Sequence, residues 1–212
     1  MPIEPVTLRT ADGLALEGEL SVPGEAWLAA VLAHPHPQFG GSMRSIVTAA
    51  MFAALPDAGV ACLRFNFRGV GRSEGSHGGG HDERADLVAA IDVLSPITEG
   101  LPLVLAGWSF GADTALAVGD ERVTGWLAVA PPLRGRAVPK MVAAEDPRPK
   151  LVVVAERDQF RPPESARPLI ETWKNTRLDV VPGADHYLVG RTDALMDLSL
   201  AWLREIFSPR SA

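Results

Sequence analysis

The sequence predicts an α/β fold with a mostly parallel twisted sheet, an N-terminal antiparallel hairpin and helices on both faces of the sheet. Short apolar runs alternate with longer periodic stretches along the chain, the pattern of consecutive βα units. Hydrophobic residues make up 47% and charged residues 22%, as in ordinary globular proteins. The 212 residues contain no repeat, low-complexity tract or linker, so we expect residues 1–212 to form a single domain.

Each expected element follows from a local pattern. The turn dipeptide Asp12-Gly13 lies between two short apolar runs and predicts a hairpin. Apolar side chains recur at 3.6-residue spacing after Ser42, which predicts a helix there, and short uniformly apolar runs predict buried strands. In order, we expect strands at 6–8, 15–20 and 29–33, a helix from near Ser42 to Gly59, a strand at 60–65, a helix at 82–94, a strand at 103–106, a helix at 110–118, strands at 123–130, 151–155 and 178–181, and a closing helix at 192–207.

The connection between the strands expected at 123–130 and 151–155 is about 20 residues long, and a pair of helices with their turns needs about 30. We therefore expect no cap domain. The functional site should be open and shaped by short loops.

Composition excludes several classes of partner. A formal net charge of −6 argues against a nucleic-acid partner, because phosphates require a basic surface. The one cysteine, Cys62, cannot form an internal disulfide, and the first ten residues lack the features of a signal peptide. No apolar run approaches the roughly 20 residues that span a bilayer. These observations favour a cytoplasmic protein without a membrane partner, and they leave the oligomeric state open.

The pattern Gly-x-Ser-x-Gly, which marks a nucleophile elbow, occurs twice, around Ser73 and around Ser109. An elbow needs a strand directly before the serine, a helix directly after it and small residues two positions away on each side. Ser109 meets all of these conditions, whereas Ser73 has only the glycines. Ser109 is therefore the expected nucleophile, and Ser73 is expected to lie in a polar turn.

A nucleophilic serine needs a base, and the base needs a carboxylate. His186 follows the last expected strand, at the same sheet edge as Ser109, and is the expected base. Asp158 follows the strand at 151–155 and is the preferred carboxylate. Glu156 is its main rival, whereas Asp185 adjoins the histidine in sequence, a poor geometry for contacting the far ring nitrogen.

Two backbone amides are expected to bind the oxyanion that forms during attack on a carbonyl. Phe110, next to the serine, supplies one. His36 or Gln38 supplies the other, because the prolines of their loop have no N–H. The side chains expected around an apolar acyl pocket are Phe39, Trp108, Leu133, Phe160 and Tyr187.

A metal site is the alternative use of the histidines. His34 and His36 could serve as ligands together with His77 and His81, but the spacing is not that of a zinc site, so no metal is expected.

In these residues and in their order, the chain resembles the α/β-hydrolase superfamily. The resemblance is carried by the order serine, aspartate, histidine, by Phe-Asn-Phe-Arg-Gly-Val-Gly-Arg-Ser at 65–73, and by His-Pro-His-Pro at 34–37 with Gly-Gly-Ser at 40–42. The chain looks most like the compact lidless bacterial serine hydrolases and esterases, which are close in size to dienelactone hydrolases. Those enzymes carry a cysteine nucleophile where this chain has Ser109. The resemblance implies no cofactor and an acyl-enzyme intermediate.

The expected function is hydrolysis of a small-molecule carboxylic ester of small to medium acyl length by Ser109, His186 and Asp158. The same residues would serve a thioesterase, a peptidase or a cofactor-free perhydrolase. A binding protein on a hydrolase scaffold is the alternative from another class, since a fold does not fix a function.

Overall fold

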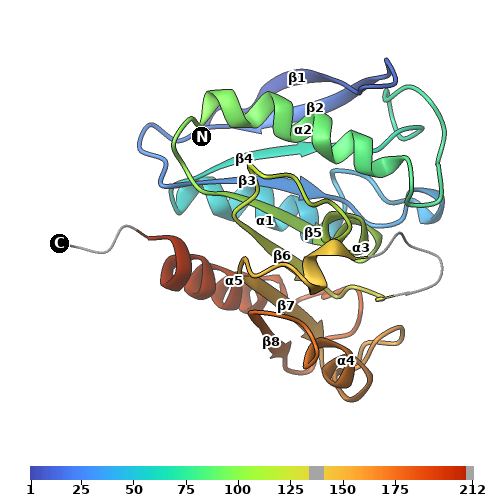
Figure 1. Ribbon diagram of the computed structural model, residues 1–212, viewed down its shortest axis with the longest axis vertical. Helices are drawn as coiled ribbons and strands as arrows, with labels where there is room; N and C mark the ends of the chain where they lie inside the picture. The colour runs from blue at the N-terminus through green and yellow to red at the C-terminus, as the bar shows by residue number, and fades with distance from the viewer. Residues whose placement is uncertain (134–140, 209–212) are drawn as a thin grey trace.

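The computed structural model describes residues 1–133 and 141–208. Its centre is a twisted eight-stranded sheet with the strand order β1-β2-β4-β3-β5-β6-β7-β8 (Figure 1). The strands are β1 Glu4–Arg9, β2 Ala15–Ser21, β3 Leu28–Ala33, β4 Val60–Phe65, β5 Leu103–Trp108, β6 Gly125–Val129, β7 Lys150–Ala155 and β8 Thr176–Val181.

The sheet is mostly parallel. Only β2 runs opposite to the other strands, because it pairs with both of its neighbours, β1 and β4, in antiparallel register. From β4 to β8 every neighbouring pair is parallel. The predicted fold class is thus confirmed, and the carboxyl ends of β3, β5, β7 and β8 meet at one edge of the sheet.

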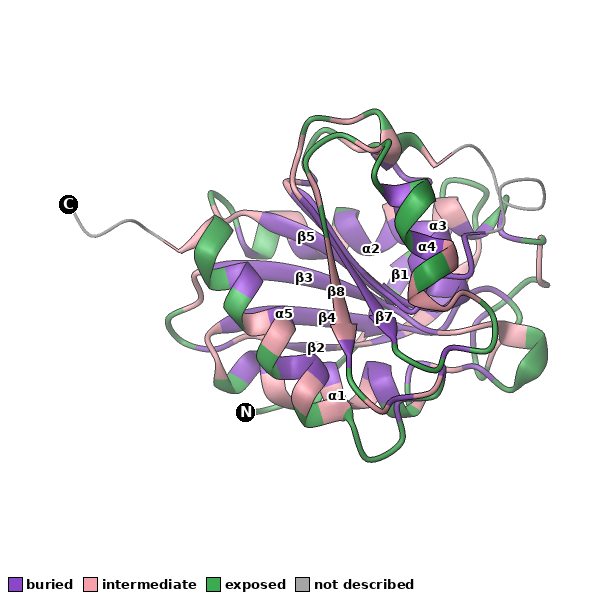
Figure 2. Ribbon diagram, turned by 90° about the horizontal axis from the view of Figure 1, so that it is seen from below, coloured by how far each residue is buried: buried purple, intermediate pink, exposed green. Residues whose placement is uncertain are grey.

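Helices cover both faces of the sheet, as the sequence predicts. A buried cluster of apolar side chains lies on each face of the sheet. Helices α1 and α5 pack on one face, and α2, α3 and α4 pack on the other. Figure 2 shows buried strands between helices whose outer surfaces are exposed. The helices are α1 Ile46–Asp57, α2 Glu83–Ile97, α3 Phe110–Leu116, α4 Pro163–Ile170 and α5 Thr192–Phe207, with short 3-10 helices η1 Pro37–Phe39 and η2 Val142–Ala144.

Two helix predictions need correction. The helix expected from near Ser42 begins at Ile46, because Ser42 and Ser45 close a turn in which each backbone N–H donates to an oxygen of the other residue. Met43, counted with the helix by its spacing, is buried from this turn. Helix α4 is absent from the prediction, although its Pro163 lies in the first turn, where a helix tolerates proline.

The connection from β6 to β7 contains, in the part that the structure describes, only the three-residue η2, so nothing there forms a helical cap. Within residues 1–133 and 141–208, no helix has the length and apolar character that crossing a bilayer requires.

Candidate active site

Ser109 lies on a sharp turn between β5 and α3. Its backbone has φ 55° and ψ −119°, a conformation that residues with a side chain rarely adopt. The surroundings hold it there: its N–H donates to the carbonyl of Val129 at 2.9 Å, and its own carbonyl accepts the N–H groups of Ala112 and Asp113. Strain that is held in this way at a single polar residue is typical of a functional site.

The two glycines of the elbow are required by packing. A Cβ on Gly107 would lie 2.5 Å from the backbone of Gly111, and a Cβ on Gly111 would lie 2.5 Å from the carbonyl oxygens of Ala33 and His34. These distances are too short for any real side chain. Gly107 is thus required because the first turn of α3 folds back on the end of β5, and Gly111 because α3 approaches the end of β3.

The structure brings the three predicted polar residues together in a line. Ser109 Oγ lies 2.9 Å from His186 Nε2, and His186 Nδ1 lies 2.9 Å from Asp158 Oδ2. All three residues are buried. Asp158 Oδ1 also accepts the backbone N–H groups of Phe160 and Arg161 at 2.8 and 3.0 Å, which fixes the carboxylate. A carboxylate at Nδ1 places the proton of a neutral ring there, so Nε2 is left to accept the serine proton.

The loop that carries His186 is fixed by contacts that sequence reasoning missed. The Trp108 indole donates from Nε1 to the His186 carbonyl at 3.1 Å, and the His186 N–H donates to Gln159 Oε1 at 3.2 Å. Trp108 ends β5, directly before the elbow, so the strand that positions the nucleophile also positions the base. The sequence gives no signal for these contacts, because they join segments far apart along the chain.

Arg161 fixes the loop that carries Asp158. Its guanidinium donates to the carbonyls of Pro132 at 3.0 Å and Leu133 at 3.4 Å, in the segment that follows β6. The N–H of Leu133 donates to Asp113 Oδ1 at 3.0 Å, and the Leu133 side chain belongs to the buried core on the face of α2 and α3.

The rival carboxylates bind backbone amides of their own loops. Glu156 Oε2 accepts the N–H of Gly183 at 2.7 Å, and Asp185 Oδ1 accepts the N–H of Tyr187 at 3.0 Å. Both groups shape the turn that presents His186, while the contact with its ring comes from Asp158.

The second Gly-x-Ser-x-Gly sequence forms a turn locked to the hairpin. Ser73 is buried, donates from Oγ to the carbonyl of Asn66 at 2.7 Å and accepts the N–H of Glu17 at 3.1 Å. Gly71 and Gly75 have φ values of 61° and 82°, in the region that favours glycine. The two motifs therefore have glycines for different reasons: helix packing around Ser109 and turn conformation around Ser73.

A pocket of about 520 Å³ opens beside Ser109. Four of the five predicted pocket residues line it, and Leu133 does not, because its side chain is packed in the core. The lining adds small and polar residues of the loop after β3 that were not predicted. It consists of Pro35, His36, Phe39, Gly40, Gly41, Ser45, Ile46, Trp108, Ser109, Phe160, His186 and Tyr187.

The three residues predicted as oxyanion donors differ in their position relative to this pocket. Phe110 is the first residue of α3, so its N–H has no carbonyl partner within the helix. His36 lines the pocket and caps η1. The Gln38 N–H donates to His36 Nδ1 at 3.2 Å, and Gln38 is outside the lining. Of the two candidates for the second donor, the structure places His36 at the pocket.

His34 is a structural histidine. It is fully buried, its Nε2 accepts the N–H of Phe67 at 3.0 Å, and its Nδ1 donates to the carbonyl of Pro35 at 2.6 Å. Burial lowers the pKa of His34 to about 4. The neutral ring thus connects the end of β3 to the segment after β4.

The ring of His77 lies beside that of His36, with centroids 4.9 Å apart, but His77 and His81 pair with different side chains. His77 Nδ1 lies 2.7 Å from the buried carboxylate of Glu83, and His81 Nδ1 contacts the Arg84 guanidinium at 2.7 Å. Across residues 1–133 and 141–208, no three His, Cys, Asp or Glu side chains gather in a group that could hold a metal ion.

The chemistry that this arrangement allows is specific. A hydroxyl at a helix N-terminus touches an imidazole, the imidazole touches a fixed carboxylate, and a pocket begins at the hydroxyl. Such a group can transfer a proton from the hydroxyl as it attacks an electrophile, and the helix N-terminus favours the negative charge that results.

Known proteins resemble the chain over most of its length. A family model described as an alpha/beta hydrolase domain matches residues 28–200. An uncharacterised protein of Rickettsia prowazekii is 29% identical over 174 residues, 77% of this chain and 73% of the relative. A solved structure of an alpha-beta serine hydrolase homologue from Coxiella burnetii has a TM-score of 0.86 at 29% identity and covers 94% of this chain and 97% of its own. A serine hydrolase without a lid from Xanthomonas campestris has a TM-score of 0.84 at 25% identity, over 100% of this chain and 99% of its own.

Proposed function

This chain belongs to the alpha/beta hydrolase domain family, and from that premise we propose that it is a serine hydrolase that cleaves carboxylic esters of small to medium acyl length. The observation that carries the proposal is the pair of 2.9 Å contacts that join Ser109 to His186 and His186 to Asp158. A strained serine with a base and an oriented carboxylate is the arrangement that makes a hydroxyl nucleophilic.

In the first half-reaction, Ser109 Oγ forms a bond to the ester carbonyl carbon while its proton passes to His186 Nε2. The carbonyl π electrons move to oxygen, and Asp158 stabilises the imidazolium. When the oxyanion collapses, the bond to the alcohol oxygen breaks. The alcohol leaves with the proton from His186, and the acyl group remains on Ser109.

In the second half-reaction, water takes the place of the serine hydroxyl. His186 accepts its proton as the oxygen attacks the acyl carbon, and it returns that proton to Ser109 Oγ as the acyl bond breaks. The carboxylic acid leaves and the site returns to its starting state.

The oxyanion is stabilised by backbone amides. The Phe110 N–H at the start of α3 is one donor, and an amide of the loop around His36 is the second. A donor of this kind lowers the barrier by about 3 kcal/mol, because it is already oriented before the charge develops.

The test compares Ser109→Ala with Ser73→Ala, the matched variant from the second serine motif. Hydrolysis of p-nitrophenyl butyrate by Ser109→Ala should fall on the order of 10⁴- to 10⁶-fold, and labelling by a fluorophosphonate probe should disappear. Ser73→Ala should keep both, while its free energy of unfolding falls by about 1–3 kcal/mol, because buried hydrogen bonds to Asn66 and Glu17 are lost. Hydrolysis that survives in Ser109→Ala, or is lost only in Ser73→Ala, would contradict the proposal.

A further inference from the structure

Besides the ring of His186 itself, five aromatic rings line the pocket beside Ser109, and they come from four separate segments. The loop after β3 supplies two of them, the end of β5 one, and the loops after β7 and β8 one each. They are His36, Phe39, Trp108, Phe160 and Tyr187. A purely aliphatic acyl chain would be held equally well by branched aliphatic side chains, of which the lining among the described residues has one, Ile46.

The rings form two groups by their contacts. His36 packs against Phe39 with ring centroids 4.7 Å apart. The second group surrounds His186: the centroid of Phe160 lies 4.5 Å from the His186 centroid, with the rings edge to face, and that of Tyr187 lies 5.7 Å away. Both groups line the same pocket, so a group bound there meets aromatic rings from more than one side.

Three of these rings contribute little to the core. The exposed fractions of Phe39, Tyr187 and Phe160 are 84%, 52% and 47%. Large apolar side chains exposed together around a pocket are typical of a surface that a ligand covers. Binding of a ligand in the pocket therefore explains better than folding why these three residues are aromatic.

We propose that the pocket binds a planar aromatic ring on the ester, so that the enzyme prefers esters that carry an aromatic ring over esters of the same size that carry a saturated ring. The inference rests on the proposed esterase function. Aromatic rings attract one another in offset and edge-to-face arrangements beyond the burial of their surface, and a puckered saturated ring lacks this attraction. With contacts from two groups of rings, we expect a preference of roughly tenfold in kcat/KM.

The experiment uses two pairs of esters matched in carbon number. Ethyl phenylacetate and ethyl cyclohexylacetate test an aromatic acyl group, whereas benzyl acetate and cyclohexylmethyl acetate test an aromatic alcohol. Each kcat/KM is divided by the rate of alkaline hydrolysis of the same ester, which removes intrinsic reactivity. A corrected aryl-to-saturated ratio near ten in either pair supports the proposal, and the pair that shows it identifies which side of the ester enters the pocket.

Two variants connect the preference to the rings. Phe39→Leu and Phe160→Leu keep an apolar side chain and remove an aromatic face, so the ratio should fall toward one. Val189→Ala is the control, because Val189 is an exposed apolar residue that follows Tyr187 by two positions in sequence and is outside the lining. It should keep the wild-type ratio.

The failures can be told apart. If all four esters are hydrolysed and both corrected ratios lie near one, the aromatic preference is wrong and the esterase function stands. If none of them nor p-nitrophenyl butyrate is hydrolysed, the proposed function itself fails. A ratio near ten that is unchanged in both leucine variants would also overturn the assignment to these rings.

Discussion

Arg161 acts on the candidate triad without touching the nucleophile. Its side chain holds the segment after β6 through two carbonyls, while its own N–H donates to Asp158. Removing the side chain leaves that N–H in place but loosens the loop. For Arg161→Ala we expect kcat to fall roughly tenfold with little change in KM, because small misplacements of a catalytic group mainly slow the chemical step.

Steady-state kinetics with p-nitrophenyl butyrate check this prediction. Arg167→Ala, an exposed arginine on α4, is the matched control and should behave as the wild type. A rise in KM at unchanged kcat would assign Arg161 to substrate binding instead of to positioning.

His34 makes stability depend on pH. Burial lowers its pKa to about 4, below the roughly 6.5 of the unfolded chain, so the unfolded state binds the proton more tightly. The contribution of His34 is fully present above about pH 6.5 and is lost as the pH falls toward 4. Between pH 7 and pH 4.5 it should lower the free energy of unfolding by about 2 kcal/mol.

Urea unfolding of the wild type and His34→Gln at the two pH values measures this contribution. The variant should be less stable at pH 7, and its loss of stability on acidification should be smaller by that amount. His81→Gln, at an exposed histidine, should keep the wild-type dependence. Equal slopes in all three proteins would show that His34 does not titrate in this window.

At the residue scale, the sequence predicts which side chains lie at the carboxyl edge of the sheet. The prediction fails for residues whose position depends on the conformation of a loop. Ser109, Asp158 and His186 each follow a parallel strand, and the structure places them in contact. Leu133 also follows a strand, but a left-handed backbone with φ 52° and the contact of its N–H with Asp113 turn it into the core. Neither feature has a sequence signal.

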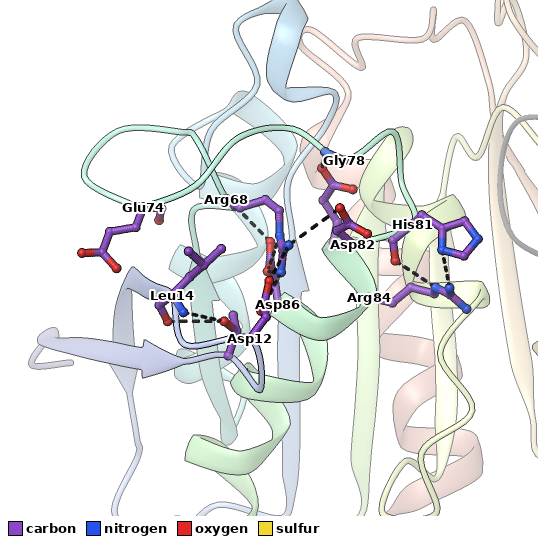
Figure 3. A network of polar contacts seen from close by, with 12 residues as sticks. Asp12, Leu14, Arg68, Glu74, Gly78, His81, Asp82, Arg84 and Asp86 are labelled. Atoms are coloured by element: carbon purple, nitrogen blue, oxygen red, sulfur yellow. Dashed lines mark hydrogen bonds and ion pairs between the residues drawn. The ribbon is translucent and has the colours of Figure 1, made fainter.

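At the scale of elements, Arg68 joins three parts of the fold that are distant in sequence (Figure 3). It contacts Asp86 of α2 at 2.7–2.9 Å and Asp12 of the β1–β2 turn at 3.0–3.3 Å. Asp86 is fully buried, and burial raises its pKa, whereas Arg68 stabilises its charged form. The hairpin and the start of α2 are therefore held through one guanidinium.

Arg68→Met should lower the free energy of unfolding by about 3–5 kcal/mol, because it leaves a buried carboxylate without its partner. Asp12→Asn changes only the half-exposed ion pair between Asp12 and Arg68, so it should lower the free energy of unfolding much less. Urea unfolding at pH 7 compares them. Equal losses would mean that the exposed contact, and not the buried one, holds these elements together.

The predictions of elements succeeded where apolar periodicity is strong and failed where polar turns or prolines interrupt it. The closing helix is observed at Thr192–Phe207, as predicted, because one buried stripe runs along it. Helix α4 was missed: Pro163 and Pro168 flank only a few apolar positions, and its burial of Ala166 and Ile170 depends on the neighbouring strands. Local pattern carries no information about such packing.

At the scale of the whole molecule, residues 1–133 and 141–208 form no helical cap, which limits how much of a substrate they can enclose. Each buried methylene improves binding by about 0.8 kcal/mol, roughly fourfold, only while apolar wall remains to cover it. In a pocket of about 520 Å³ over which the described part of the chain forms no helical cap, kcat/KM should rise over the first few acyl carbons and then flatten or fall.

The measurement compares acetate, butyrate, octanoate and palmitate esters below and above their solubility limits. No sudden activation should occur when the ester forms a separate phase, because such activation requires a lid that opens. A maximum at palmitate together with a jump at the interface would show that the loops close over the site.

The contacts of Ser109, His186 and Asp158 also have a consequence for how fast the enzyme becomes active as it folds. Seventy-seven residues separate Ser109 from His186, and 28 separate Asp158 from His186. Closing loops of this length loses chain entropy before any contact compensates, so contacts between distant segments form slowly. Helical circular dichroism, which reports local structure, should therefore recover early during refolding. Ester hydrolysis should return only in the slowest phase, when β8 has docked beside β7 and the histidine reaches the serine.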